Sequence, residues 1–168
     1  AFPTIFQIKY PITGTPLVSI VIPNKDHVED LRRCITSIEK KSTWKNYEII
    51  VVENNSVEQN IRDYYKELES DPKVKIVTYE GGFNYSRINN VGVKETKGEY
   101  LLFLNNDTEV INPDWMEQLL MYAQRKDVGA VGAKLYYADN TIQHAGVVIG
   151  LGAHRSAGHT PVSYTHLT

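Results

Sequence analysis

The chain has 168 residues, of which 42% are hydrophobic, so it is long enough for one globular domain with a core and too short for two of ordinary size. Its 18 basic and 20 acidic side chains give a formal net charge of -2, which excludes the broad positive field of a sequence-independent nucleic-acid binder. The single cysteine, Cys34, excludes an intrachain disulfide and suits a reducing cytoplasm, while no apolar run approaches the roughly 20 residues of a transmembrane helix.

Short β-branched or apolar runs alternate with segments of helical spacing along the chain. The runs predict strands at residues 17–23, 47–52, 74–78, 100–104 and 128–134. The first helix is expected to bury Val28, Leu31, Ile35 and Ile38, with Asp26 and Glu29 as a capping box, and Cys34 reads as a buried structural thiol. Because parallel strands need long crossovers, the pattern predicts an α/β fold with a mostly parallel, twisted sheet and helices on both faces.

Three further helices complete the expected pattern. The second is marked by Val57, Ile61, Tyr64 or Tyr65, and Leu68. The third is expected over residues 85–96, with Gly98 as its exit. The fourth begins at Asn112-Pro113-Asp114 and presents Trp115, Leu119 and Tyr122. We expect an N-terminal extension at residues 1–16, one domain at 17–160, and a tail at 161–168 that is disordered or non-native because it is polar and lacks periodicity.

The loops that follow the first four strands are polar and acidic. In a parallel sheet, ligands bind at the carboxyl ends of the strands, where these loops meet. The loop after the first strand lacks the Gly-x-Gly-x-x-Gly turn that brings backbone amides to a pyrophosphate, which disfavours a dinucleotide-dependent dehydrogenase. A pyrophosphate bound here needs another source of positive charge, and a divalent cation held by Asp107 at the end of the fourth strand provides one.

Four segments in order resemble the large inverting glycosyltransferase family two, whose fold is called GT-A. They are Val18-Ser-Ile-Val-Ile-Pro23, Val51-Val-Glu-Asn-Asn-Ser56, Asn90-Val-Gly92 and Leu102-Phe-Leu-Asn-Asn-Asp107, and the similarity runs from about Leu17 to His159. The later segment Ile142-Gln-His-Ala-Gly-Val-Val148 resembles one that is common in bacterial polysaccharide and rhamnan-type members. The resemblance implies the Rossmann-like, nucleotide-binding half of a GT-A enzyme, without its acceptor-binding half.

The same resemblance implies roles for individual residues. Pro23 and Asn24 are expected to shape the floor of the nucleotide pocket, and Glu53 to meet the base or ribose. Asn105, Asn106 and Asp107 match the Asp-x-Asp metal motif with asparagine in place of the first aspartate, so Asp107 is assigned the contact to Mn2+ or Mg2+. The loop and helix after the third strand are expected to reach the diphosphate with Asn84, Arg87 and Asn90.

The implied reaction is transfer of a sugar from a nucleotide-diphosphate sugar to a hydroxyl of a glycan or lipid-linked acceptor, with inversion, in bacterial surface polysaccharide synthesis. A UDP-sugar is the first expectation for the donor, by its frequency in the family. The location is expected to be cytoplasmic, at the inner membrane face in the full-length protein. The family's catalytic base belongs to a later acidic motif that nothing after Lys134 matches, so no base is assigned and the chain is expected to bind donor but transfer it poorly.

Plainer interpretations stand beside these. Asp107 and Asp26 could cap helices, Glu53 could belong to a turn, and Arg87 and Lys25 could be solvated charges. Gly81-Gly82 could relieve backbone strain, and the tyrosines and Trp115 could serve the core. His144, His154 and His159 lack the spacing of a zinc site and read as surface or hydrogen-bonding residues. The competing function is a non-catalytic nucleotide-binding or assembly module.

Overall fold

The computed structural model describes residues 8–146, 148–149 and 157–158. The chain divides into two compact units, Ala1–Met121 and Tyr122–Thr168, which are described separately. His154, His159 and the tail at residues 161–168 lie outside the described residues. Among the described residues, no helix has both the length and the apolar character that a bilayer crossing requires.

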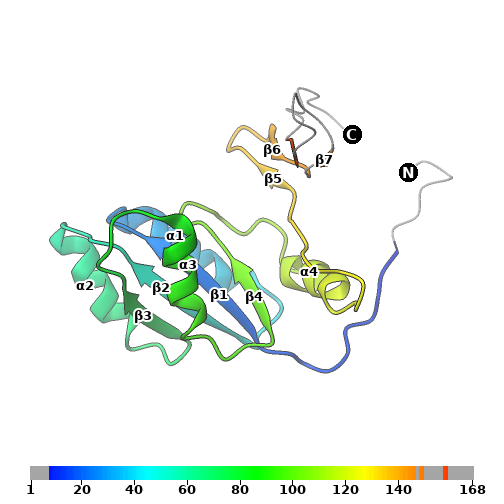
Figure 1. Ribbon diagram of the computed structural model, residues 1–168, viewed down its shortest axis with the longest axis horizontal. Helices are drawn as coiled ribbons and strands as arrows, with labels where there is room; N and C mark the ends of the chain where they lie inside the picture. Colours follow the sequence, from blue (N-terminus) through cyan, green and yellow to red (C-terminus); the bar gives the residue numbers. More distant parts are fainter. Residues whose placement is uncertain (1–7, 147, 150–156, 159–168) are drawn as a thin grey trace. The chain divides into compact units, whose positions relative to one another are not determined.

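The first unit is built on a four-stranded parallel sheet with the strand order β3-β2-β1-β4 (Figure 1). The strands are β1 Val18–Asn24, β2 Tyr47–Glu53, β3 Val74–Thr78 and β4 Tyr100–Phe103. β1 and β2 are the two inner strands, and they are buried along nearly their whole length. Their continuous apolar runs reflect a sheet that is covered on both faces, so the predicted fold class is confirmed.

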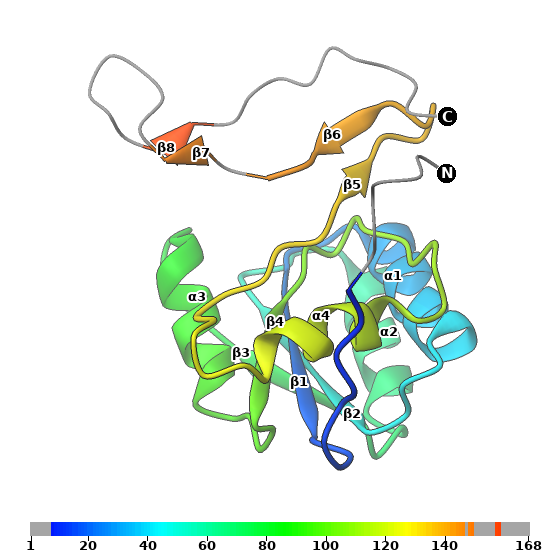
Figure 2. The same ribbon diagram turned by 90° about the vertical axis from the view of Figure 1, so that its right-hand side faces the viewer.

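Helices cover both faces of this sheet, and Figure 2 shows α3 on one side with α1 and α2 on the other. The helices are α1 Val28–Lys41, α2 Gln59–Leu68, α3 Tyr85–Val93 and α4 Trp115–Ala123. Ile20 and Ile22 of β1 point into the core beneath α1, α2 and α4, whereas Val21 points into a smaller core beneath α3. The predicted apolar face of α1 is buried as expected, and Cys34 on that helix is fully buried.

The capping box predicted for α1 is wrong. No side chain caps this helix, and the residue before it, His27, has left-handed backbone angles. The Asp26 carboxylate instead accepts hydrogen bonds from the backbone N–H groups of Val57 (2.8 Å) and Glu58 (3.0 Å), immediately before α2. Asp26 therefore supports the helix that follows the next strand, because tertiary structure brings the two loops together.

The exit predicted for α3 is also wrong. The helix ends at Val93, and Gly98 lies in the connection to β4. A Cβ atom on Gly98 would lie 2.5 Å from the Ser19 hydroxyl oxygen and 2.7 Å from the Leu17 carbonyl oxygen. Gly98 is thus needed for close approach between the chain and the start of β1, where its N–H donates to Ser19 Oγ.

Two apolar faces differ from those predicted. Val57 lies before α2 and is 77% exposed, while Ile61, Tyr64, Tyr65 and Leu68 are buried. α4 begins at Trp115 and buries Met116, Leu120 and Met121, whereas Trp115, Leu119 and Tyr122 are only half-buried. Apolar side chains surround most of α4, so sequence spacing alone could not select the face that the core covers.

The second unit contains no strand at residues 128–134, contrary to prediction, although all seven residues are described. Gly129 and Gly132 interrupt this segment, and glycine weakens a strand because it has no side chain to pack. The first strand of this unit is β5 Leu135–Tyr136, which pairs antiparallel with β6 Ile142–His144. β7 Val148–Ile149 pairs antiparallel with β8 Ala157–Gly158.

Candidate functional site

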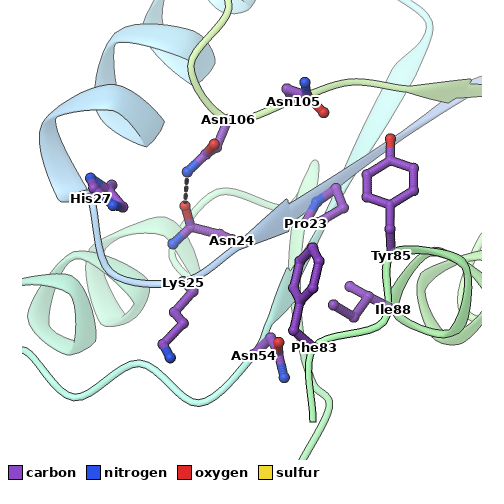
Figure 3. Close-up of a pocket in the computed structure, with 10 residues that line it drawn as sticks. All are labelled: Pro23, Asn24, Lys25, His27, Asn54, Phe83, Tyr85, Ile88, Asn105 and Asn106. Carbon is purple, nitrogen blue, oxygen red and sulfur yellow. Dashed lines mark hydrogen bonds between the residues drawn. The ribbon is translucent and has the colours of Figure 1, made fainter. Parts of the chain in front are cut away.

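A pocket of about 480 Å³ lies at the carboxyl edge of the parallel sheet (Figure 3). It is lined by Pro23, Asn24, Lys25, His27, Asn54, Phe83, Tyr85, Ile88, Asn105 and Asn106. Four predicted site residues from two separate strand ends meet here, namely Pro23 and Asn24, the last two residues of β1, and Asn105 and Asn106 after β4. The parallel sheet explains their meeting, because the ends of β1 and β4 are adjacent in it.

Asn24 forms the buried centre of this edge, with only 3% of its surface exposed. Its Nδ2 donates to the Asp26 carbonyl oxygen at 3.0 Å and to the Tyr65 hydroxyl at 2.7 Å. Its Oδ1 accepts from Asn106 Nδ2 at 2.6 Å, the dashed contact in Figure 3. The Asn24 amide therefore fixes the loop after β4 against the end of β1, and it is a rigid part of the pocket floor.

Glu53, predicted to meet the base or ribose, does not line the pocket. Its Oε1 accepts from the Ser56 N–H at 2.5 Å, and its Oε2 accepts from the Tyr65 hydroxyl at 2.7 Å and from the Ser56 hydroxyl. Burial raises the pKa of the Tyr65 hydroxyl, which stays protonated and donates. Both carboxylate oxygens of Glu53 thus hold the turn after β2 together, and a contact with ligand remains a prediction.

The loop between β1 and α1 has an uncommon backbone conformation. Asp26 and His27 both have φ 52, in the left-handed region that non-glycine residues seldom adopt. Surrounding contacts hold this bend, since Asp26 donates its N–H to the Ser56 hydroxyl at 2.8 Å and accepts from Asn24 at its carbonyl. Hydrogen bonding by the Glu58 N–H lowers the pKa of the Asp26 carboxyl. The bend places Lys25 and His27 along the pocket.

A second anchored loop follows β3. Asn54, which is buried, donates from Nδ2 to the carbonyl oxygens of Tyr79 at 3.0 Å and Gly81 at 2.9 Å. Asn55, with φ 58, donates to the same Gly81 carbonyl at 2.9 Å. A Cβ on Gly81 would lie 2.2 Å from the hydroxyl oxygen of the Tyr79 side chain, so glycine leaves room for that ring in its present position. These bonds position Phe83, which lines the pocket.

The three residues of this segment that are predicted to reach a diphosphate are exposed and lie outside the pocket lining. Asn84 is the N-cap of α3, where its Oδ1 accepts from the Arg87 N–H at 3.0 Å. The side chains of Arg87 and Asn90 are exposed on α3, and none of the three lines the pocket. Their proposed contacts require a ligand that extends past the present pocket boundary.

Asp107 follows Asn106 directly and is exposed to solvent. Among the described residues, no group of three or more His, Cys, Asp or Glu side chains could enclose a metal ion. Mg2+ and similar hard cations are commonly held by one or two carboxylates, with substrate phosphates and water supplying the remaining oxygens. One exposed carboxylate beside the amides of Asn105 and Asn106 fits that open arrangement.

Sequence reasoning missed several pocket residues. His27, Asn54, Phe83, Tyr85 and Ile88 line the pocket and were not among the predicted site residues. Polarity at strand ends, the sequence criterion, does not select aromatic or apolar side chains, and tyrosines in this sequence read as packing residues. The signal that could have identified the aromatic pair is its position on either side of the helix-capping Asn84.

Comparison with known proteins gives matches over most of the chain. The family model described as glycosyl transferase family 2 matches residues 19–154. A protein of Sinorhizobium fredii named y4gI is 46% identical over 158 residues, which are 94% of this chain and 17% of that protein. The O-antigen biosynthesis protein RfbC of Myxococcus xanthus is 42% identical over 151 residues, which are 89% of this chain and 12% of that protein. The chain thus spans less than a fifth of the length of these relatives.

Solved structures share the fold. The mannosyltransferase PcManGT of Pyrobaculum calidifontis, in complex with GDP-Man and Mn2+, superposes with a TM-score of 0.65 at 14% identity, over 76% of this chain and 38% of that one. TarS residues 1–349 of S. aureus, in complex with UDP-GlcNAc, gives a TM-score of 0.53 at 21% identity, over 63% of this chain and 30% of that one. Together with the parallel sheet, this likeness confirms the predicted GT-A fold.

Proposed function

The chain belongs to glycosyl transferase family 2, and from that premise we propose that it is the donor-binding part of an inverting glycosyltransferase of bacterial surface polysaccharide synthesis. The similarity to an O-antigen biosynthesis protein supports the pathway. In this proposal residues 17–160 form the nucleotide-sugar-binding domain, and the acceptor half with its catalytic base lies in another part of the protein. A UDP-sugar is the first donor to test, beside a GDP-sugar, because solved structures of this fold contain both nucleotides.

One observation carries the proposal: Asn106 is hydrogen-bonded to the buried Asn24 while its neighbour Asp107 stays exposed. The bond fixes the backbone beside Asp107 without occupying the carboxylate. We therefore assign Asp107, which adjoins the pocket-lining Asn106, to a cation on the donor's diphosphate, and the amides of Asn105 and Asn106 to oxygens of the ribose or phosphates. Glu53 supports this edge by holding Tyr65 and the turn after β2.

In the proposed reaction, an acceptor hydroxyl attacks the anomeric carbon, loses its proton to a general base, and the nucleoside diphosphate leaves with the electrons of the broken bond. Mn2+ or Mg2+ at Asp107 supplies positive charge for the leaving diphosphate. Lys25, which lines the pocket, and Arg87 on α3 are exposed cations, and we assign them to the phosphates together with Asn84 and Asn90.

A second candidate function is a nucleotide-binding module without transferase activity. Two observations favour it: Asn105 replaces the first aspartate of the metal motif, and both oxygens of the Glu53 carboxylate are already hydrogen-bonded within the protein. Transfer from a UDP- or GDP-sugar by the parent protein, measured with Mn2+, separates the two. An active parent supports the transferase, and nucleotide binding without transfer or hydrolysis supports the module.

The direct test is calorimetric titration of the chain with UDP and GDP, with and without Mn2+. We expect binding that depends on the cation, and we expect Asp107→Ala to abolish that dependence. Glu99→Ala is the matched control, because Glu99 is an exposed carboxylate at the opposite end of β4. Cation-dependent affinity that survives in Asp107→Ala would reject the metal assignment, and absence of binding to either nucleotide would reject the donor site.

A further inference from the structure

Two aromatic side chains line the pocket while remaining open to solvent. Phe83 is 81% exposed and Tyr85 is 48% exposed, although both flank Asn84, the N-cap of a helix that packs on the sheet. Ile88, on the same helix, is almost fully buried in the core beneath α3. The core is thus filled by Ile88, and packing within the described residues does not account for the placement of the two rings.

The segment that carries these rings is held in place. Asn54 and Asn55 bind the Gly81 carbonyl from the end of β2, and the Asn84 side chain caps α3 between the two aromatic residues. Figure 3 shows both rings on the side of the pocket where Pro23 and Ile88 lie. An exposed apolar wall carried on an anchored backbone suits a flat ligand, because stacking then requires little ordering of the backbone.

We propose that Phe83 and Tyr85 form the wall on which the base of the donor nucleotide stacks. This inference rests on the proposed function. In the strand order β3-β2-β1-β4, Asp107 follows β4 and Phe83 follows β3, so the ends of β1 and β2 lie between the strands that carry them. From β4 to β3, this edge carries first a carboxylate, then side-chain amides, then aromatic rings. A nucleoside diphosphate has its diphosphate, ribose and base in the matching order.

Stacking on an aromatic face accepts every base, because each base has a π-face. The wall is therefore expected to strengthen binding of UDP and GDP alike. Truncation of a stacking ring typically lowers affinity by about 5- to 150-fold. Inorganic pyrophosphate has no base, so its binding should not depend on either ring.

The test is calorimetry of Phe83→Ala, Tyr85→Ala and Phe83→Trp with UDP, GDP and inorganic pyrophosphate, all with Mn2+. We expect both alanine variants to lose affinity for UDP and GDP by about 5- to 150-fold and to retain affinity for pyrophosphate. Phe83→Trp should bind nucleotide as the unaltered chain does. Val57→Ala is the control, because Val57 is similarly exposed, at 77%, and does not line the pocket. Urea unfolding confirms that the variants remain folded.

Several other results would each overturn part of the proposal. Unchanged affinity for UDP and GDP in both alanine variants would overturn the stacking role, and so would a parallel loss of pyrophosphate binding. With UDP-GlcNAc and GDP-Man titrated alongside, a loss confined to these sugar nucleotides, with UDP and GDP unaffected, would overturn the role in base stacking and assign the wall to the sugar. Failure of the unaltered chain to bind any of these ligands would overturn the proposed function itself, and the stacking role with it.

Discussion

The buried amide of Asn24 donates a 2.7 Å hydrogen bond to the hydroxyl of Tyr65. That hydroxyl donates in turn to Glu53 Oε2, also at 2.7 Å. One side chain on α2 therefore joins the ends of β1 and β2 beneath the proposed nucleotide site. Asn24 cannot rotate without breaking this bond or the one from Asn106.

Replacing Tyr65 with phenylalanine should destabilise the fold and weaken nucleotide binding together. The change removes the partner of a buried amide and one donor to a carboxylate, which costs about 1–3 kcal/mol of unfolding free energy. Urea denaturation measures this cost, and calorimetry with UDP and Mn2+ measures the affinity. Tyr64→Phe is the control, because Tyr64 is also buried on α2 and contacts Arg32 through its ring, which the change retains. Equal effects of the two variants would contradict the prediction.

Asp26→Ala should destabilise α2, although Asp26 precedes α1 in the chain. The variant leaves the N–H groups of Val57 and Glu58 without their acceptor, and loss of such a cap costs roughly 1 kcal/mol. The folded-state pKa of Asp26 is lowered, so its contribution is present above the unfolded pKa near 3.8 and is lost as pH falls through the folded pKa.

Urea unfolding of Asp26→Ala at pH 7 and at pH 3 checks this cap. The difference from the unaltered chain should be larger at pH 7 than at pH 3. Asp30→Ala is the matched control, since Asp30 lies on α1 and its contacts are exposed ion pairs with Arg33 and His27. A larger loss from Asp30→Ala than from Asp26→Ala would be inconsistent with the cap.

Gly92→Ala should strain the contact between α3 and the sheet. A Cβ at this position would lie 2.6 Å from a methyl of Val21 and 2.7 Å from a methyl of Val52. Overpacking of this kind costs about 1–3 kcal/mol of unfolding free energy. Gly129→Ala has no atom within 4 Å of its new Cβ and should change stability by less than about 0.5 kcal/mol. Thermal unfolding of both variants measures the difference, and similar midpoints would refute the packing argument.

Cys34 should make the fold sensitive to alkali. Burial raises the pKa of its thiol from 9.0 to about 11, so the unfolded chain releases this proton first as pH rises. The stability that the neutral thiol contributes is complete below about pH 9 and is lost as pH approaches about 11, a change of roughly 2–3 kcal/mol. Unfolding free energies of Cys34→Ala should therefore fall less steeply over this window. Comparing slopes removes the packing cost of the substitution, and identical slopes would contradict the prediction.

The sequence predicted the parallel sheet because β1 and β2 are continuous apolar runs, which only a doubly covered sheet requires. It predicted Asn24 and Asn106 at one edge because strand ends converge in such a sheet. The partner of Asp26 could not be predicted, since a carboxylate near one helix can cap another once the loops meet. Phe83 was missed for a similar reason, because only the fold shows that Ile88 fills the core in its place.

The contact between Asn24 and Asn106 joins residues that are 82 positions apart, and it accompanies the pairing of β1 with β4. β1 is therefore synthesised early but gains its second neighbouring strand late, since β4 follows β2, β3 and three helices in the chain. Parallel pairings of such long range close slowly, and an unpaired strand edge invites association with other chains meanwhile. The yield of refolding from urea should accordingly fall as protein concentration rises. In hydrogen exchange during refolding, β4 should be the last strand whose amides become protected.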